Sequence, residues 1–572
     1  MTRGWTLFVL GWLLVFGGGL WAHKVQTSGG IRLEDVRFAG ADGTPMSGLL
    51  YIPVTATPQT PAPGVLAVHG YINSRETQDG FAIEFARRGY VVLAIDQTGH
   101  GYSGGAATAN GYGGPDGLRY LKSLAFVDPA NIGLEGHSMG GWAVLSAAAA
   151  DPSGYKAMVL EGSAVGVRLP PKGMLISPPG SPQFPKNLAV VYSRYDEFAP
   201  LMWAVPRASG VGASAKLMAL FGQATPVTAG RLYGSIADGT ARELYQPATT
   251  HPGDHLSPEA IGDAVDWFSR PLAGGTPRPA DDQIWMWKEV ATLIVFAGVV
   301  LVMLGAFDLA LRLPAFAALA EPGEPTRERR GAGWWTMLAA TALIPPLTFY
   351  PFMLIGMIAV PPSHAFPQAI TNQLMVWALL NAAVTVAASL VLRGPKARAN
   401  LRLVPAVGIA LVSVGAGYLA LSAADFFFKV DARFWVVALK LLSPRQFGWF
   451  LAYLVPFTAF FVVALGSLQT NLMVKGDGAA AQYATVLAAL AGGFLVFLLA
   501  EYVPLFATGQ LPVPAEALNA IISIQFLPLL AIVAVIAVFT WRRTNSYLPG
   551  AFLCGLFVTW YIVAGTAVQF GG

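Results

Sequence analysis

The 572-residue chain is 54% hydrophobic and only 12% charged, with a formal net charge of +4 at pH 7. This balance is typical of an integral membrane protein. The basic residues occur in short clusters beside apolar runs, which indicates topology signals and argues against a nucleic-acid partner. The single cysteine, Cys554, excludes an intrachain disulfide and a cysteine-based zinc site.

The chain begins with an apolar stretch from about Gly4 to Trp21, preceded by Arg3. Its length is close to the ~20 residues that cross a bilayer. The stretch could be a cleaved signal peptide or a retained anchor. A cleavage site needs small residues, but bulky Leu20 stands where one is wanted. We therefore predict an uncleaved transmembrane anchor over residues 1–23.

Residues 24–283 have the sequence pattern of a soluble domain, with polar turns and frequent Gly and Pro. An expected antiparallel hairpin, residues 31–38 and 46–52, comes first. The pattern then predicts buried strands over 64–68, 90–95, 132–135, 157–160 and 188–192, and helices over 81–88, 115–124, 140–150 and 258–268. This alternation predicts an α/β domain with a mostly parallel sheet and helices on both faces.

Residues 284–572 change to long apolar runs separated by short polar connections. By the ~20-residue criterion we predict about eight transmembrane helices. They cover roughly 286–311, 334–360, 373–392, 403–424, 447–469, 480–507, 518–541 and 547–569. Residues 434–442 could instead form a short interfacial helix, which would change the count by one.

Basic residues mark alternate connections between these spans. They are Arg3; Arg312, Arg327, Arg329 and Arg330; Arg393, Lys396, Arg398 and Arg402; Lys475; and Arg542 and Arg543. Under the positive-inside rule they define the cytoplasmic side, so residues 24–283 are expected outside the cytoplasm, on a bacterial inner or plasma membrane. Four further basic residues between positions 429 and 445 fall on the outer side, so the later spans are less well oriented.

The segment Gly136-His137-Ser138-Met139-Gly140 follows a predicted strand and opens a predicted helix. This is the context of a Gly-x-Ser-x-Gly nucleophile elbow, a sharp turn whose close backbone approaches only small residues permit. The N-terminus of the helix behind the serine favours developing negative charge. We therefore predict Ser138 as a nucleophile.

An oxyanion hole needs two backbone donors aimed at the reacting carbonyl oxygen. Met139, directly after the nucleophile, would supply one amide. Tyr71, which follows His69 and Gly70 at the end of strand 64–68, would supply the other. We interpret the His69 side chain as structural. Asp96 and His100, in the glycine-rich turn after the next strand, are interpreted in the same way.

A catalytic acid is expected after a later strand, where it would orient the imidazole and stabilise its cation. Asp196 lies in the loop just past strand 188–192. Glu161, past the preceding strand, and the adjacent Glu197 are its competitors. We favour Asp196.

Two histidines, His251 and His255, compete for the role of general base. Both lie in the expected loop between the last strand and the last helix. His255 stands two residues before Ser257, the expected N-cap, and would be held at the helix start. His251 has a loop long enough to reach Ser138, so we favour it. The resulting chain order Ser, Asp, His is the one expected of α/β hydrolases.

On these residues, the region from about Ile31 to Arg270 resembles the α/β-hydrolase superfamily, through His69-Gly70, the Asp96–Gly104 turn and the Ser138 elbow. The whole chain resembles bacterial α/β hydrolases fused to a polytopic C-terminal domain. The resemblance implies acyl transfer to water through an acyl-enzyme, and the sequence carries no metal or nucleotide signature. One departure is the long stretch between Asp196 and the base, in which residues 201–240 could form a cap over the acyl pocket or pack against the membrane domain.

Three functions compete at this point. The first is an ester hydrolase of the carboxylesterase or lipase kind, acting on an extracytoplasmic and lipid-like substrate beside the bilayer. The second is a serine peptidase on the same scaffold. The third is a transporter or assembly subunit with a non-catalytic hydrolase-like domain, for which Glu501 and Asp308 would be the intramembrane charges. Both residues lie near span ends, so we interpret them as interfacial.

Overall fold

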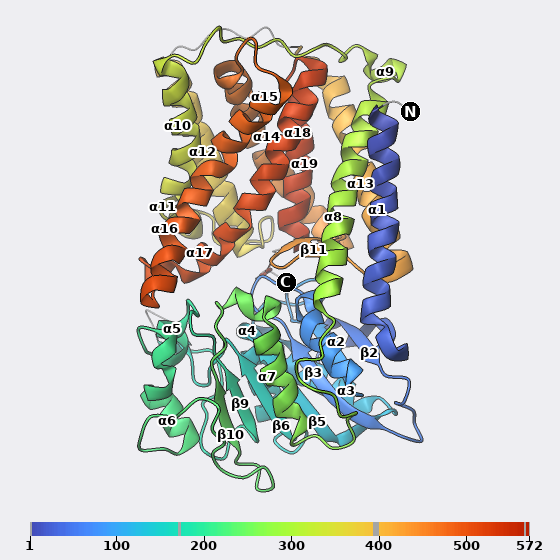
Figure 1. The fold of residues 1–572 in the computed structure, drawn as a ribbon, viewed down its shortest axis with the longest axis vertical. Helices are drawn as coiled ribbons and strands as arrows, with labels where there is room; N and C mark the ends of the chain where they lie inside the picture. The colour runs from blue at the N-terminus through green and yellow to red at the C-terminus, as the bar shows by residue number, and fades with distance from the viewer. Residues whose placement is uncertain (1–2, 170–172, 393–399, 566–567, 571–572) are drawn as a thin grey trace. The chain divides into compact units, whose positions relative to one another are not determined.

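A computed structural model describes residues 3–169, 173–392, 400–565 and 568–570. They form two compact units (Figure 1). The α/β unit comprises Trp21–Val290, Glu501–Ala517 and Val568–Gly572, and the helical unit comprises Met1–Leu20, Ala291–Ala500 and Leu518–Ala567. The predicted basic cluster Arg393, Lys396 and Arg398 lies outside the described residues.

An eight-stranded sheet forms the centre of the α/β unit, in the order β1-β2-β4-β3-β5-β6-β9-β10. The strands are β1 (Arg32–Ala39), β2 (Pro45–Ile52), β3 (Ala62–Val68), β4 (Val91–Asp96), β5 (Val127–His137), β6 (Ala157–Glu161), β9 (Leu188–Val191) and β10 (Arg242–Tyr245). β1 with β2 and β2 with β4 are antiparallel, and every other neighbouring pair is parallel. The predicted hairpin and mostly parallel sheet are confirmed.

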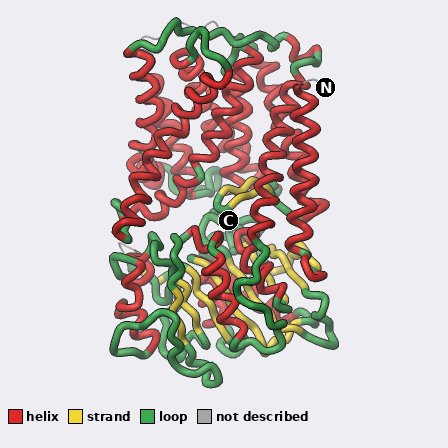
Figure 2. The backbone as a smooth tube through the Cα atoms, in the orientation of Figure 1, coloured by secondary structure: helices red, strands yellow, loops and turns green. Residues whose placement is uncertain are grey.

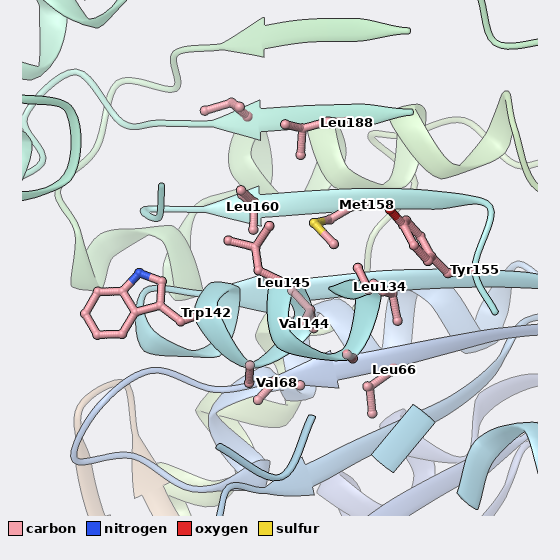
Figure 3. Packing of buried hydrophobic residues seen from close by; sticks show 14 of the residues in the cluster. Leu66, Val68, Leu134, Trp142, Val144, Leu145, Tyr155, Met158, Leu160 and Leu188 are labelled. Carbon is pink, nitrogen blue, oxygen red and sulfur yellow. The ribbon is translucent and has the colours of Figure 1, made fainter. Parts of the chain in front are cut away.

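Four main helices accompany the sheet, namely α2 (Asp79–Arg87), α3 (Gly114–Ser123), α4 (Met139–Ala150) and α7 (Pro258–Ser269). Side chains along a strand alternate between its two faces. In β3, Leu66 and Val68 enter the core that α3 and α4 cover, while Val65 and Ala67 enter the core that α2 and α7 cover. Figure 3 shows α4 packing on the strands of the first core. Two separate cores therefore hold the sheet from both sides, as the alternation of strands and helices predicted.

The long insertion after β9 contains α5 (Ala199–Trp203), a 3-10 turn (Ala208–Ala213) and α6 (Ala215–Phe221). Trp203 of α5 and Leu217 and Leu220 of α6 are buried in the same core as α4. Burial of each such side chain contributes about 1.5–3 kcal/mol relative to exposure. The apolar residues of the insertion thus pack on the core of its own domain, and its role as a cap over a substrate pocket stays a prediction.

Two segments from the far C-terminal part of the chain also belong to the α/β unit. One is Glu501–Ala517, and the other begins at Val568. The Gln569 amide donates to the Gly99 carbonyl oxygen at 3.0 Å, and the Ala107 amide donates to the Gln569 carbonyl oxygen at 2.9 Å. No local pattern in the sequence indicated that these segments would join the α/β domain.

Helices make up nearly all of the rest of the chain (Figure 2). They are α1 (Arg3–Gln26), α8 (Met286–Ala310), α9 (Pro314–Ala317), α10 (Ala332–Leu347), α11 (Phe349–Ala359), α12 (Ala369–Leu392), α13 (Leu403–Phe428), α14 (Pro444–Leu472), α15 (Ala479–Leu487), α16 (Gly493–Thr508), α17 (Ala517–Ile524), α18 (Phe526–Thr544) and α19 (Leu548–Gly565). In the described part of the chain, eight helices or continuous helix pairs are long and apolar enough to cross a membrane. The pair α10–α11, bent by 52° after two prolines, would be a ninth.

The interfacial helix considered for residues 434–442 is wrong. Residues Ala432–Phe434 and Val437–Leu439 form the antiparallel hairpin β11–β12. Trp435, in the two-residue turn between them, has a φ of 53°. A left-handed residue at this position reverses the chain, and the aromatic Phe434 before it and the β-branched Val437 after it favour strand over helix.

Within the helical unit, α1 and α8 approach closely through glycines. A Cβ atom on Gly11 would lie 2.8 Å from the Gly298 carbonyl oxygen, and one on Gly298 would lie 2.8 Å from the Gly11 carbonyl oxygen. Small residues permit this kind of backbone approach between apolar helices.

The Gly298→Val variant is therefore expected to lose about 1–3 kcal/mol of stability, because the added isopropyl group would collide with the backbone of α1. Thermal melting of the detergent-solubilised protein measures this loss. Gly415→Val in α13 is the control, since no atom lies within 4 Å of a Cβ at that position. Equal melting temperatures for the two variants would contradict the α1–α8 packing.

Asp308, one of the two acidic residues considered above as intramembrane charges, forms an ion pair inside the helical unit. Its Oδ1 lies 2.6 Å from Nε of Arg543, in the last turn of α18. A carboxylate neutralised in this way needs no transport role to account for its presence.

Candidate active site

Ser138 occupies a sharp turn between β5 and α4. Its φ of 55° and ψ of −119° are strained for a residue with a side chain. A Cβ atom on Gly140 would lie 1.9 Å from the Val68 carbonyl oxygen, and one on Gly136 would lie 2.3 Å from the Gly140 carbonyl oxygen. Glycine is therefore required on both sides of the serine, which explains the Gly-x-Ser-x-Gly spacing physically.

The backbone of this turn is fixed by hydrogen bonds to the adjacent strand end. The Ser138 amide donates to the Glu161 carbonyl oxygen at 2.7 Å, and the Ser163 hydroxyl donates to the Ser138 carbonyl oxygen at 2.7 Å. Ser138 is partly exposed, whereas its neighbours His137 and Met139 are buried. The turn thus presents the Ser138 side chain while it buries the residues on either side.

The two predicted oxyanion donors come from the segments expected to supply them. Met139 is the first residue of α4, where backbone amides have no partner within the helix. Tyr71 follows Gly70, and a Cβ on Gly70 would lie 3.1 Å from the Ser138 Cβ. Within the described residues neither the Tyr71 nor the Met139 amide donates a hydrogen bond. Both amides are therefore free to bind an oxyanion.

Asp196 and His251 form a direct pair. Asp196 Oδ2 lies 2.7 Å from His251 Nδ1. The other carboxylate oxygen of Asp196 accepts the Phe198 amide at 2.7 Å and the Tyr192 hydroxyl at 3.1 Å. With the Nδ1–H donated to Asp196, the lone pair of Nε2 is available as a base.

The His251 ring lies close to the nucleophile turn. Its centroid is 4.6 Å from that of His137, the residue before Ser138. A Cβ atom on Gly162, just past β6, would lie 2.8 Å from His251 Nδ1, so only glycine leaves room for the ring. Burial by itself would lower the pKa of His251, but the Asp196 carboxylate, supported by Glu197 and Asp254, raises it above its ordinary value.

The competing residues have other surroundings. The His255 ring lies 4.2 Å from His137 and 6.1 Å from Phe81, centroid to centroid. The Ser257 hydroxyl accepts the Ala260 amide at 3.1 Å, as expected of an N-cap. The structure therefore holds His255 beside the start of α7 and pairs His251 with the acid.

Neither alternative acid contacts the His251 ring. Both carboxyl oxygens of Glu161 are buried and accept no hydrogen bond from the described residues. Burial and the nearby Glu135 raise the pKa of Glu161 well above its usual range, which disfavours the ionised form that a catalytic acid partner of histidine requires. Glu197 Oε2 instead accepts the backbone amide of His251 at 2.8 Å.

The three residues interpreted as structural have structural contacts. His69 Nδ1–H donates to the Gly70 carbonyl oxygen at 2.7 Å, and His69 Nε2 accepts the Gln97 amide at 3.1 Å. Asp96 accepts the amides of Arg75 and Tyr102 at 2.9 and 3.0 Å. These bonds shape the two loops beside the nucleophile turn. His100 Nδ1–H donates to the Thr98 carbonyl oxygen at 3.0 Å.

Sequence reasoning missed two polar residues that support the site. Asp254 accepts a hydrogen bond from the Ser193 hydroxyl and lies 3.5 Å from His137 Nε2. The Tyr502 hydroxyl donates to Glu197 at 3.0 Å. Asp254 could have been noticed because it falls between the two candidate histidines, but no signal in the sequence connects Tyr502 to residues 305 positions away.

The sheet order, the strand-to-helix turn at Ser138 and the covering helices define the class of α/β hydrolases. Residues 59–195 match the family model described as serine aminopeptidase, S33, and this part of the chain belongs to the α/β-hydrolase superfamily.

A curated monoacylglycerol lipase from Mycolicibacterium smegmatis is 36% identical over 114 residues, which cover 19% of this chain and 41% of that protein. Among solved structures, an esterase from Pyrococcus furiosus is 18% identical, covering 43% of this chain and 94% of that one with a TM-score of 0.29. A predicted CIB-like hydrolase from Thermoplasma acidophilum is 17% identical, covering 42% of this chain and 98% of that one with a TM-score of 0.29.

Proposed function

We propose that this chain is a membrane-anchored serine hydrolase that cleaves a carboxylic ester through an acyl-enzyme on Ser138. The observation that carries the proposal is the 2.7 Å pair of Asp196 and His251 in the unit that also holds Ser138 on a strained turn. A buried carboxylate on Nδ1 is the arrangement that makes an imidazole a general base for a serine. This pair also argues against a purely non-catalytic, transporter-like domain.

The reaction follows from this arrangement. Ser138 Oγ attacks the ester carbonyl carbon while its proton passes to His251 Nε2, and Asp196 stabilises the resulting imidazolium. The Tyr71 and Met139 amides stabilise the oxyanion. Collapse of the tetrahedral intermediate breaks the bond to the alcohol, which takes the proton from His251. Water then attacks the acyl-enzyme by the same steps in reverse, releasing the acid and restoring Ser138.

The substrate proposed is a lipid-like ester outside the cytoplasm, with the N-terminus in the cytoplasm and the bilayer as partner. The long apolar helices and the distribution of basic residues support this orientation. The similarity to a monoacylglycerol lipase supports an ester of a fatty acid. No cofactor is required for this chemistry.

A serine peptidase is the second candidate, because the matching family model is described as a serine aminopeptidase. The test is a panel of p-nitrophenyl esters of increasing acyl length beside aminoacyl-nitroanilides, assayed on membranes containing the full chain. We expect hydrolysis of the esters, rising with acyl length, and no release of nitroaniline. Cleavage of the anilides alone would replace the esterase with a peptidase.

A further inference from the structure

Glu197 connects the base of the proposed triad to a distant segment of the chain. Its Oε2 accepts the backbone amide of His251 at 2.8 Å, and its Oε1 accepts the hydroxyl of Tyr502 at 3.0 Å. Tyr502 lies in α16, and the segment Glu501–Ala517 belongs to the α/β unit. A continuous set of hydrogen bonds therefore runs from Tyr502 through Glu197 to His251.

A second contact joins the same face of α16 to the loop that contains Asp196. The Phe506 ring lies 5.2 Å from the Tyr195 ring, edge to face at 77°. Tyr502 and Phe506 are one helical turn apart, so both side chains project from one side of the helix. They contact Glu197 and Tyr195, the residues on either side of Asp196. The helix thus secures the loop that carries the acid at two points.

The Glu197 carboxyl group needs these partners. It is 4% exposed and stands next to Asp196. Burial, reinforced by the Asp196 charge, raises the pKa of Glu197 to about 7, while His251 acts in the opposite direction. A buried carboxylate is stable only when hydrogen-bonded, and the Tyr502 hydroxyl and the His251 amide each donate one bond to it.

We propose that Tyr502 is a positioning residue for the hydrolase reaction: its hydroxyl holds Glu197 as a carboxylate that fixes the backbone of His251 and stabilises the imidazolium. The inference rests on the proposed function. Tyr502 acts through Glu197. The titratable groups of this arrangement are Asp196, His251 and Glu197 themselves. Tyr192, hydrogen-bonded to Asp196, His137, whose ring lies 4.6 Å from that of His251, and Asp254, which acts on His251, face them.

The direction of the pH effect follows from charge. The acid limb of the kcat/KM profile reports protonation of the base in the free enzyme. Because the Glu197 carboxylate contributes to raising the pKa of His251, its neutralisation lowers that pKa and moves the acid limb to lower pH. Loss of the Tyr502 hydroxyl makes Glu197 harder to ionise. The Tyr502→Phe substitution should therefore also move the acid limb to lower pH.

The experiment compares Tyr502→Phe, Glu197→Gln and the double variant of the full chain in detergent, with an ester from the panel as substrate. We expect each single variant to lower kcat roughly tenfold with little change in KM, since a hydrogen bond to a charged group is lost. The double variant should match Glu197→Gln, and all three should shift the acid limb to lower pH. The control is Tyr155→Phe, which removes a hydroxyl that accepts the Lys186 amide at 2.9 Å, away from the site, and should leave kcat and the limb unchanged.

A Tyr502→Phe enzyme with the kcat and acid limb of Tyr155→Phe would overturn the inference, as would additive losses in the double variant. Should Tyr502→Phe melt at a lower temperature, the pH profile of that same variant decides, because general destabilisation does not shift the acid limb. Ester hydrolysis that persists in Ser138→Ala would overturn the proposed function itself, whatever Tyr502 does.

Discussion

The Ser138→Ala variant is expected to lose ester hydrolysis by about 10⁴-fold or more and to lose all labelling by a fluorophosphonate probe. Removal of the nucleophile of a serine triad has an effect of this size, because the residual rate comes only from binding and the oxyanion hole. Serine and alanine both carry a Cβ atom, so the substitution neither adds nor relieves backbone strain at the positive φ of residue 138. The fold should therefore be retained.

The measurement is probe labelling of membranes containing the full chain, followed by ester turnover. Ser146→Ala is the matched control, since Ser146 lies on α4 and its hydroxyl donates to the Trp142 carbonyl oxygen at 2.8 Å. We expect full labelling of Ser146→Ala. A Ser138→Ala protein that is labelled like wild type would remove the basis for the enzyme and favour a binding module.

The His251→Gln variant is expected to lower kcat by about 10⁴-fold, with Asp196→Asn close to it, since an amide at position 196 cannot hold the imidazole in the required tautomer. His255→Gln should have a much smaller effect, because Asp196 is paired with the His251 ring while the His255 ring packs beside His137 and Phe81. Steady-state kinetics of the three variants distinguishes the two histidines, and a larger loss in His255→Gln would assign the base to the other ring.

The pH profile of the wild-type enzyme gives an independent measure. Protonated His251 cannot accept the Ser138 proton, so kcat/KM falls as pH drops through the pKa of His251. That pKa is raised above its ordinary value by Asp196, which places the acid limb at higher pH than for an unperturbed histidine. Asp196→Asn removes the charge and should move the limb of the residual activity to lower pH.

Much of the architecture could be predicted because it depends on local patterns. The strand runs around Val65–Val68 and Leu188–Val191 are apolar on both faces, which only a covered parallel sheet satisfies. Apolar segments of bilayer length likewise predict helices wherever they lie, since no water is available there for backbone groups. The exception was the hairpin at 432–439, where eight residues are too few for hydropathy to distinguish strand from helix.

Within the site, the sequence by itself determined the nucleophile turn, because the Gly-x-Ser-x-Gly spacing is contained in five consecutive residues and the steric demand on Gly136 comes from Gly140 among them. Only the tertiary structure decided which acid meets which base. Asp196 and Glu197 are chain neighbours that both carry a carboxylate. In the folded loop the Asp196 carboxylate binds the His251 ring, whereas the Glu197 carboxylate binds the His251 backbone amide. The Tyr502 contact spans 305 positions, and a hydrogen bond between residues so far apart leaves no periodicity for sequence reasoning to detect.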